Sequence, residues 1–194
     1  MRKITFGQNP RLNKLFQSFA IFLALCSCGF AQQERAWKTF SPAGGAWSIL
    51  APGEMRPDAE ALESPSTKGS YSYSDFNGFF AVIYRDSPKR WVPWKPNYNS
   101  YFKKIRNDAV EAAKGQLLKD EEFSNGGATG REVYIKVPSG KLVGAEGQVI
   151  TKYRVERLRM FFHEKRFYLL VAVLPEEDIS SPAVNGYFNS FVAK

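Results

Sequence analysis

Residues 167–174 read Phe-Tyr-Leu-Leu-Val-Ala-Val-Leu, and this stretch decides the fold. The run is almost entirely apolar and is stopped by Pro175. A strand of this composition is covered on both faces, so we expect it at the centre of a sheet. The preceding His163-Glu-Lys-Arg166 predicts a tight hairpin turn, which joins the central strand to a long strand over residues 148–162.

Further strand patterns surround this hairpin. Residues 131–137 alternate polar and apolar side chains, and an Asn-Gly-Gly turn separates them from another strand pattern over residues 116–123. Four shorter strand patterns occupy the first half of the chain: 37–40, 46–50, 70–74 and 79–84. Residues 54–68 are rich in Pro, Glu and Ser and residues 138–147 contain several glycines, so both are predicted to be loops.

The hydrophobic period changes at residues 98–114, where apolar side chains recur every three or four positions. Charged residues occupy the opposite side, which is typical of an amphipathic helix lying on a sheet. A second apolar stripe predicts a closing helix over residues 182–192, with Asp178 or Ser180 as its cap. Strand meanders with two helices predict an α+β fold, in which an antiparallel β-sheet is sandwiched by the helices, one on each face.

The first 31 residues differ in character from the rest. They contain four basic residues and no acid, with an apolar run over residues 19–25 and small residues up to Ala31. This pattern indicates a signal peptide. The apolar run is shorter than the roughly 20 residues that span a bilayer. We therefore predict an exported protein, periplasmic or extracellular, with a single domain over residues 32–194.

Two processing routes remain open. Cleavage after Ala31 releases a domain that begins at Gln32, and the small residues before this site favour that route. Alternatively, Leu25-Cys-Ser-Cys28 serves as a lipoprotein box, so that Cys28 is lipidated and anchors the protein to a membrane. Cleavage after Ala31 removes both cysteines of the sequence and leaves a domain without a disulfide, a thiol nucleophile or a thiolate ligand.

The charge of the chain is less extreme than its total suggests. The whole sequence carries 27 basic and 19 acidic residues, a net charge of +8. Removing the four basic residues of the predicted signal leaves 23 against 19, a net charge of +4. This mild excess suits an anionic envelope surface, an acidic partner or ordinary solubility. A single histidine and no cysteine beyond the signal predict no transition-metal site, and no motif indicates a cofactor.

Trp91 and Trp94 lie in a proline-rich loop, Trp-Val-Pro-Trp-Lys-Pro, over residues 91–96. Rigid aromatic side chains are effective binding anchors when they are exposed. If they are buried, they only cover the core. We treat both tryptophans as partner-binding candidates.

Basic residues concentrate on the hairpin over residues 148–174, where Arg157, Arg159 and Arg166 are mixed with aromatic side chains. We treat these three arginines as binding candidates for an acidic partner or an anionic lipid surface. A solvated strand face is the simpler explanation of the same pattern. Nucleic acid is not expected, because the chain is predicted to be exported and nearby acids dilute the positive field.

The strand and helix motifs also share a characteristic spacing along the chain. Its elements are Trp37-x-x-Phe40-Ser-Pro42, Gly44-Gly45-x-Trp47-Ser-Ile-Leu50-x-Pro52-Gly53, Phe80-x-Val82-x-Tyr84-x-Asp86-x-Pro88, Gly130-Arg131-Glu132, Arg157-x-Arg159-x-Phe161, Arg166-x-Tyr168-x-Leu170 and Tyr187-Phe188-x-Ser190-Phe191. This pattern resembles the PsbP-like superfamily, whose fold is shared by PsbP and Mog, and especially its exported bacterial members of unknown function. The resemblance implies an antiparallel sheet between helices and a binding or assembly role without catalysis. It assigns no site residue.

The leading hypothesis is a non-enzymatic binding or assembly module of the cell envelope, without a cofactor. One alternative is a serine-type hydrolase built on His163, the only histidine, which requires a hydroxyl within hydrogen-bond reach of its ring. The other alternative is a small-ligand carrier, which requires a cavity between sheet and helix lined by Phe79, Tyr101 and Phe167.

Overall fold

The computed structural model describes residues 37–44, 46–59, 67–86, 98–125, 128–143 and 148–194. The predicted signal peptide, the lipidation candidate Cys28 and the partner-binding candidates Trp91 and Trp94 lie outside these ranges. Their predictions therefore stay predictions. Within the described ranges, no helix is both long enough and apolar enough to cross a membrane.

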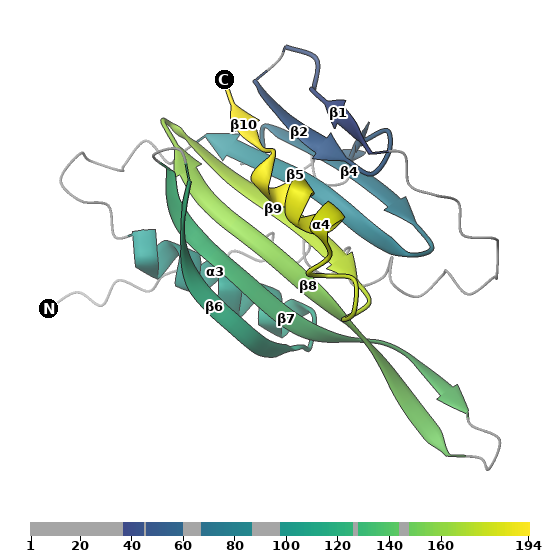
Figure 1. Cartoon of the computed structure of the whole chain (residues 1–194). Helices are drawn as coiled ribbons and strands as arrows, with labels where there is room; N and C mark the ends of the chain where they lie inside the picture. The colour runs from purple at the N-terminus through teal and green to yellow at the C-terminus, as the bar shows by residue number, and fades with distance from the viewer. Residues whose placement is uncertain (1–36, 45, 60–66, 87–97, 126–127, 144–147) are drawn as a thin grey trace, which may run out of the picture.

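A seven-stranded antiparallel sheet forms the centre of the fold (Figure 1). In spatial order its strands are β3 (Arg56–Pro57), β4 (Gly69–Asp75), β5 (Gly78–Asp86), β9 (Arg166–Leu174), β8 (Val149–His163), β7 (Ala128–Val143) and β6 (Gln116–Asn125). β9 lies in the middle, pairs with β5 and β8, and is buried from Phe167 to Leu174. The predicted central strand is confirmed, and so is the tight turn between His163 and Arg166.

Helix α3 (Tyr98–Ala112) covers one face of this sheet, behind the strands in Figure 1. Phe102, Ile105 and Ala109 are its buried residues, and all three belong to the predicted apolar stripe. They share a core cluster with strand residues such as Leu158 and Val171. The amphipathic helix predicted over residues 98–114 is therefore confirmed.

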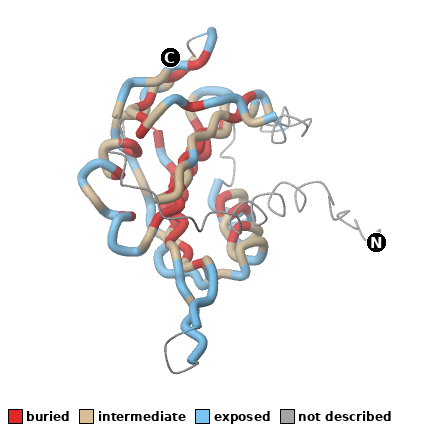
Figure 2. The backbone as a smooth tube through the Cα atoms, turned by 90° about the vertical axis from the view of Figure 1, so that its right-hand side faces the viewer, coloured by how far each residue is buried: buried red, intermediate tan, exposed pale blue. Residues whose placement is uncertain are grey.

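Helix α4 (Pro182–Asn189) and a small sheet cover the opposite face. The small sheet consists of β1 (Lys38–Phe40), β2 (Trp47–Ala51) and β10 (Val192–Ala193), with β2 in the middle. An eight-residue helix is about 12 Å long, whereas a nine-residue strand extends about 30 Å. The helix alone is too short to cover this face, so the small sheet completes the layer. Figure 2 shows buried residues concentrated between the two covering layers.

The closing helix is shorter than predicted. Its N-cap is Ser181 and not Asp178 or Ser180, and its last residue is Asn189. The early end has a tertiary cause, because residues 192–193 pair with β2 as a strand and an extended strand cannot continue a helix. The predicted apolar stripe extended past Asn189 because Phe191 is partly buried against the core, whereas Val192, the last residue of the stripe, is exposed.

The prediction of a loop is wrong for residues 138–143, which belong to β7, whereas residues 144–147 lie outside the described ranges. β7 and β8 continue beyond the last pairs that they make with β6 and β9, and there they pair only with each other. We call this two-stranded extension the hairpin arm, residues 138–143 and 149–153. Its register shifts between Pro138 and Gly140, so these two residues mark a bulge in a strand and not a loop.

Ser190 joins α4 to the small sheet, and its replacement is a first test of this layer. The Leu50 N–H donates a hydrogen bond to Ser190 Oγ over 2.7 Å, and Ser190 Oγ donates to the Tyr187 carbonyl over 3.1 Å. Ser190→Ala leaves the Leu50 N–H without this acceptor, so we expect the free energy of unfolding to fall by about 1–2 kcal/mol.

Urea denaturation measures this change as a lower midpoint with an unchanged slope. Ser180→Ala is the matched control, since Ser180 is an exposed serine and its replacement should alter stability by less than about 0.5 kcal/mol. Equal midpoints for the two variants would show that Ser190 does not hold the layer in place.

Candidate functional site

Arg157 and Arg159 are buried, with exposed fractions of 4% and 5%. The prediction that they form a contact surface for a partner is therefore wrong. They lie at alternate positions of β8 and face α4, and Arg159 pairs in register with Glu132 of β7. The sheet thus brings the Glu132 carboxylate directly opposite Arg159 and diagonal to Arg157, and burial of all three follows from α4 lying above them.

Glu132 lies between the two arginines and binds both. Arg157 donates from Nε to Oε1 of Glu132 over 2.9 Å, and its Nη2 lies 2.7 Å from the same oxygen. Arg159 donates from Nε to Oε2 over 2.6 Å, and its Nη2 lies 2.5 Å from that oxygen. We call Glu132, Arg157 and Arg159 the buried ion cluster. Each carboxylate oxygen of Glu132 binds one arginine, so neither oxygen is free to bind a ligand.

The outer nitrogens of the buried ion cluster bind α4. Nη1 of Arg159 donates to the Phe188 carbonyl over 2.8 Å and to the side chain of Asn189 over 3.1 Å. Carbonyls at the C-terminal end of a helix lack intrahelical partners and favour a positive charge. Nη1 of Arg157 donates to the side chain of Asn185 over 2.7 Å. The buried ion cluster therefore fixes the end and the middle of α4 on the sheet.

Electrostatics hold the cluster in one charge state. Burial alone would raise the pKa of Glu132, but the charges of Arg159 and Arg157 and the hydrogen bonds to this carboxylate lower its pKa below the ordinary value. Burial raises the pKa of the neighbouring Tyr134 to about 12, and its hydroxyl donates to Glu132 over 2.9 Å. Neither group changes protonation near neutral pH, so the arrangement is suited to holding structure and not to proton transfer.

Several residues that carry the family resemblance take part in the packing of the core. A side chain at Gly130, next to the cluster on β7, would collide with the Met160 carbonyl of β8. The Trp47 and Phe191 rings stack with their centroids 5.8 Å apart, and the Tyr187 hydroxyl donates to the Ala81 carbonyl over 2.7 Å. These contacts give the motif residues a role in core packing and assign no binding site to them.

Arg166 lies apart from the other two arginines, at the start of β9. It is half-buried, and its guanidinium lies 5.8 Å from the centre of the Tyr84 ring. A hydrogen bond from its side chain to Tyr168 raises the pKa of Arg166. The structure therefore does not unite the three predicted arginines in one surface, and of the three only Arg166 is open to solvent.

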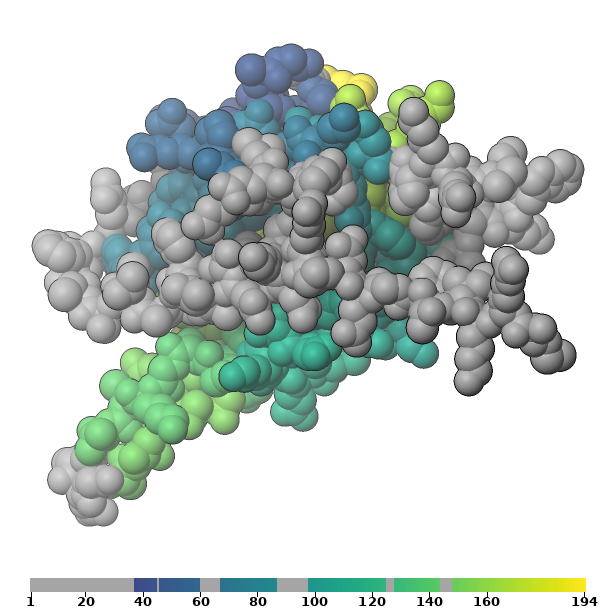
Figure 3. Space-filling model, turned by 180° about the vertical axis from the view of Figure 1, so that it is seen from behind, coloured from purple at the N-terminus to yellow at the C-terminus, as the bar shows by residue number. Residues whose placement is uncertain are grey.

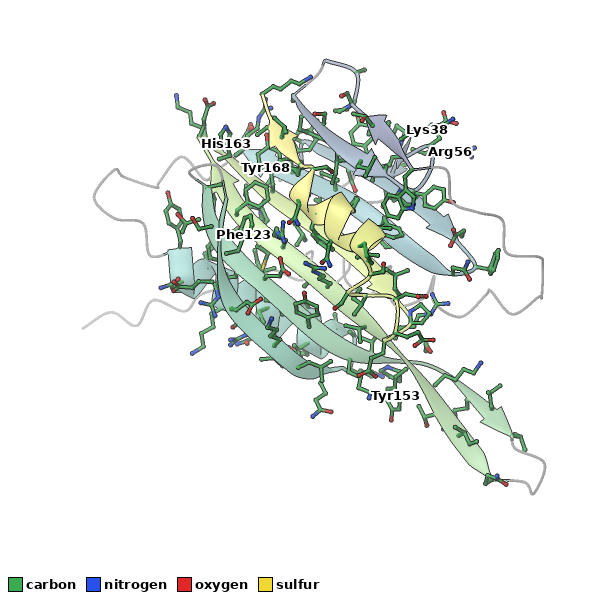
Figure 4. The ribbon with its side chains drawn as sticks, viewed as in Figure 1. Lys38, Arg56, Phe123, Tyr153, His163 and Tyr168 are labelled. Carbon is green, nitrogen blue, oxygen red and sulfur yellow. The ribbon has the colours of Figure 1, made fainter. Side chains whose placement is uncertain are left out.

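His163 ends β8 at the tight turn, opposite Arg166 (Figure 4). The turn contains Glu164, whose backbone has a φ of 50°. Within the described ranges, the His163 side chain makes no hydrogen bond to a hydroxyl or a carboxylate. Nor do the described residues include a group of three or more His, Cys, Asp or Glu side chains that could hold a metal ion. The described geometry gives no support to the hydrolase alternative.

The side chains proposed to line a ligand cavity pack against one another. The Tyr101 and Phe167 ring centroids lie 5.3 Å apart in an edge-to-face arrangement. The Arg85 guanidinium lies 5.2 Å from the first ring and 5.0 Å from the second. Phe79 packs against the same cluster. Ring contacts occupy the space that the ligand-carrier alternative requires, and this counts against it.

Four apolar side chains at the end of the hairpin arm are exposed: Leu142, Val143, Val149 and Ile150. We missed this surface in the sequence because Pro138 and Gly140 made the segment look like a loop. Two short apolar runs, Leu142-Val143 and Val149-Ile150, lie on either side of residues 144–147, and this pattern could have predicted the two paired strands.

Searches for related proteins identify the fold. No family model matches the chain, and no curated protein is similar in sequence. The solution structure of cyanobacterial PsbP (CyanoP) from Synechocystis sp. PCC 6803 superposes with a TM-score of 0.56 at 12% identity, covering 88% of this chain and 99% of that chain.

The Ran-binding protein Mog1p of Saccharomyces cerevisiae superposes with a TM-score of 0.50 at 14% identity. That match covers 82% of this chain and 96% of the yeast protein. Sequence identities this low show the fold and no shared activity. The chain has the PsbP-like α+β fold, as the spacing of its sequence motifs implied.

Proposed function

We propose that the protein is an exported, non-enzymatic binding or assembly module of the cell envelope. The observation that carries the proposal is that the charged residues of the buried ion cluster, Glu132, Arg157 and Arg159, bind one another and α4. The buried ion cluster fixes α4 on the sheet, so the guanidinium groups of Arg157 and Arg159 serve internal contacts. The predicted signal peptide supports export, and the likeness to a Ran-binding protein supports a binding role.

The proposed partner is an envelope protein or another anionic envelope component. Trp91 and Trp94 stay the proposed anchors, and Arg166 is the remaining proposed contact among the arginines. Cys28 stays the proposed lipid anchor if the lipoprotein route is used. The proposal requires no cofactor.

Mass spectrometry of the protein recovered from an envelope fraction tests export and processing together. We expect either a free N-terminus at Gln32 or an acylated Cys28. A Cys28→Ser variant separates the two routes, because it leaves cleavage after Ala31 intact and abolishes acylation. Recovery of the uncleaved chain from the cytoplasm alone would refute the export proposal.

Photocrosslinking in cells tests the contact residues. A photoreactive amino acid placed at Trp91, Trp94 or Arg166 should give a discrete adduct with one partner. Lys103, an exposed residue on the outer side of α3, is the matched control and should give none. Adducts of equal yield from all four positions would show random collision and would contradict these contact sites.

A further inference from the structure

The hairpin arm projects away from the body of the molecule, as Figure 1 shows from the front and Figure 3 from behind. The exposed fractions of the four apolar side chains near its end lie between 47% and 75%. Single exposed apolar residues are normal, but a contiguous apolar group at the end of a projection indicates a binding surface. We call Leu142, Val143, Val149 and Ile150 the apolar tip.

The apolar tip is apolar on both of its faces. Val143 pairs with Val149, and Leu142 pairs with Ile150. Paired residues in an antiparallel ladder share a face, and successive residues point to opposite faces. One valine pair therefore lies on one side of the ribbon and the leucine–isoleucine pair on the other. A flat protein surface would cover only one side, whereas a fluid apolar medium surrounds both.

A lysine stands behind the apolar tip on each face. Lys141 lies two residues before Val143, and Lys152 two residues after Ile150, so each lysine shares a face with one apolar pair. Both are exposed, and neither forms an ion pair with the described part of the chain. Lysine side chains bury their methylene stems and reach out to phosphate groups at a membrane surface.

We propose that the apolar tip inserts into the surface of an anionic phospholipid bilayer, with Lys141 and Lys152 bound to the lipid phosphates. This inference rests on the proposed function, because export would bring the domain to a membrane surface. The arm also needs such a contact energetically, since a two-stranded ribbon without further pairing is only marginally stable in water. The paired backbone satisfies the hydrogen bonds between its two strands, and shallow insertion leaves the outer edges near the wet headgroups.

A fluorescent label on the apolar tip tests the insertion directly. The two cysteines of the sequence both lie in its first 31 residues, so Cys26→Ser/Cys28→Ser yields a full chain without cysteine. Val149→Cys in this background carries an environment-sensitive nitrobenzoxadiazole label. With vesicles of equal parts phosphatidylglycerol and phosphatidylcholine, we expect its emission to rise and shift to the blue. With pure phosphatidylcholine vesicles we expect a much weaker change.

Leu118 on β6 provides the matched label position. It is exposed to the same extent as Leu142, 47%, but it lies on the body of the protein. A label at Leu118→Cys should not respond to vesicles. This comparison separates insertion of the arm from attachment of the whole chain through its N-terminal segment, which would affect neither label by itself.

Variants measure the two contributions to vesicle affinity. Each lysine near an anionic surface is worth about five-fold in affinity, so Lys141→Gln/Lys152→Gln should weaken binding about thirty-fold. Lys103→Gln/Lys165→Gln removes the same charge from exposed positions away from the arm and should change little. Serine at all four positions of the apolar tip should weaken binding about a hundred-fold.

Several outcomes would overturn the inference. One is an equal response of both labels, and another is a silent tip label on anionic vesicles. Loss of self-association or of a protein adduct in the serine variant, without any change in vesicle binding, would instead make the tip a protein contact. Export and processing are measured separately, by mass spectrometry of the N-terminus. If the chain is exported but the fluorescence of the tip label does not change with vesicles, only this inference is refuted. If the chain is not exported but the tip label responds to vesicles, only the proposed function is refuted.

Discussion

Replacing Glu132 by glutamine lowers the free energy of unfolding by about 3–5 kcal/mol at neutral pH. The substitution keeps the shape of the side chain but removes the only charge that neutralises Arg157 and Arg159 within the buried ion cluster. Guanidinium groups do not lose their proton in proteins, so two buried positive charges would face each other without a counter-ion. The loss is read from the urea midpoint, and faster hydrogen exchange in α4 should accompany it.

Glu121→Gln is the matched control for this experiment. Glu121 stands opposite Glu132 on β6, but it is exposed, and within the described ranges its ion pair is with the exposed Lys119. Exposed ion pairs are worth about 0–1 kcal/mol, so this variant should unfold almost like the parent protein. If both glutamine variants cost less than about 1 kcal/mol, the buried ion cluster does not hold α4, and the structural role assigned to its arginines is wrong.

Glu156 gives the second large effect, and it depends on pH. This residue is 7% exposed and pairs in register with Ile135 and Val173, which belong to the core on the α3 side. Burial raises the pKa of Glu156 to about 7. The folded protein therefore binds a proton at this site that the unfolded chain has already lost between about pH 4.3 and 7.

This bound proton determines the direction in which stability changes with pH. Stability falls as pH rises through that window, because the folded protein must either keep the proton or bury a charge. We expect the free energy of unfolding to be about 2–3 kcal/mol lower at pH 8 than at pH 5 on account of Glu156. Glu132 acts in the opposite direction, since its lowered pKa makes stability fall as pH drops below about 4.3.

Glu156→Gln should remove most of the decline between pH 5 and pH 8. Urea denaturation of the parent and the variant at both pH values measures it. Glu122→Gln, an exposed residue on β6, should keep the decline of the parent protein. An unchanged decline in Glu156→Gln would show that this carboxyl group is ionised and solvated in the folded protein at neutral pH.

Local sequence patterns were sufficient for the main layers. The apolar run over 167–174, bounded by a turn and Pro175, predicted a central strand, and the three-to-four spacing over 98–114 predicted an amphipathic helix. The motif spacing then identified the arrangement of these elements. The strand and helix signals are each contained within a single element, whereas the motif spacing extends from Trp37 to Phe191.

The buried ion cluster could not be read in the same way. Arg157 and Arg159 alternate with apolar residues, which is also the pattern of a solvated strand face. Their counter-ion lies 25 residues away from Arg157 and 27 from Arg159, and α4 follows later still. Only strand register and the position of the helix reveal that the charges are enclosed.

Leu50 and Ser190, which bind each other across the small sheet, are 140 residues apart. The strand that carries Leu50 therefore cannot complete its pairing until almost the whole chain has been synthesised. We expect this layer to assemble late in folding, and a nascent chain to stay open until then. If the proposed export takes place, such a chain would suit passage through a narrow secretion channel, because it would remain threadable while it is being made.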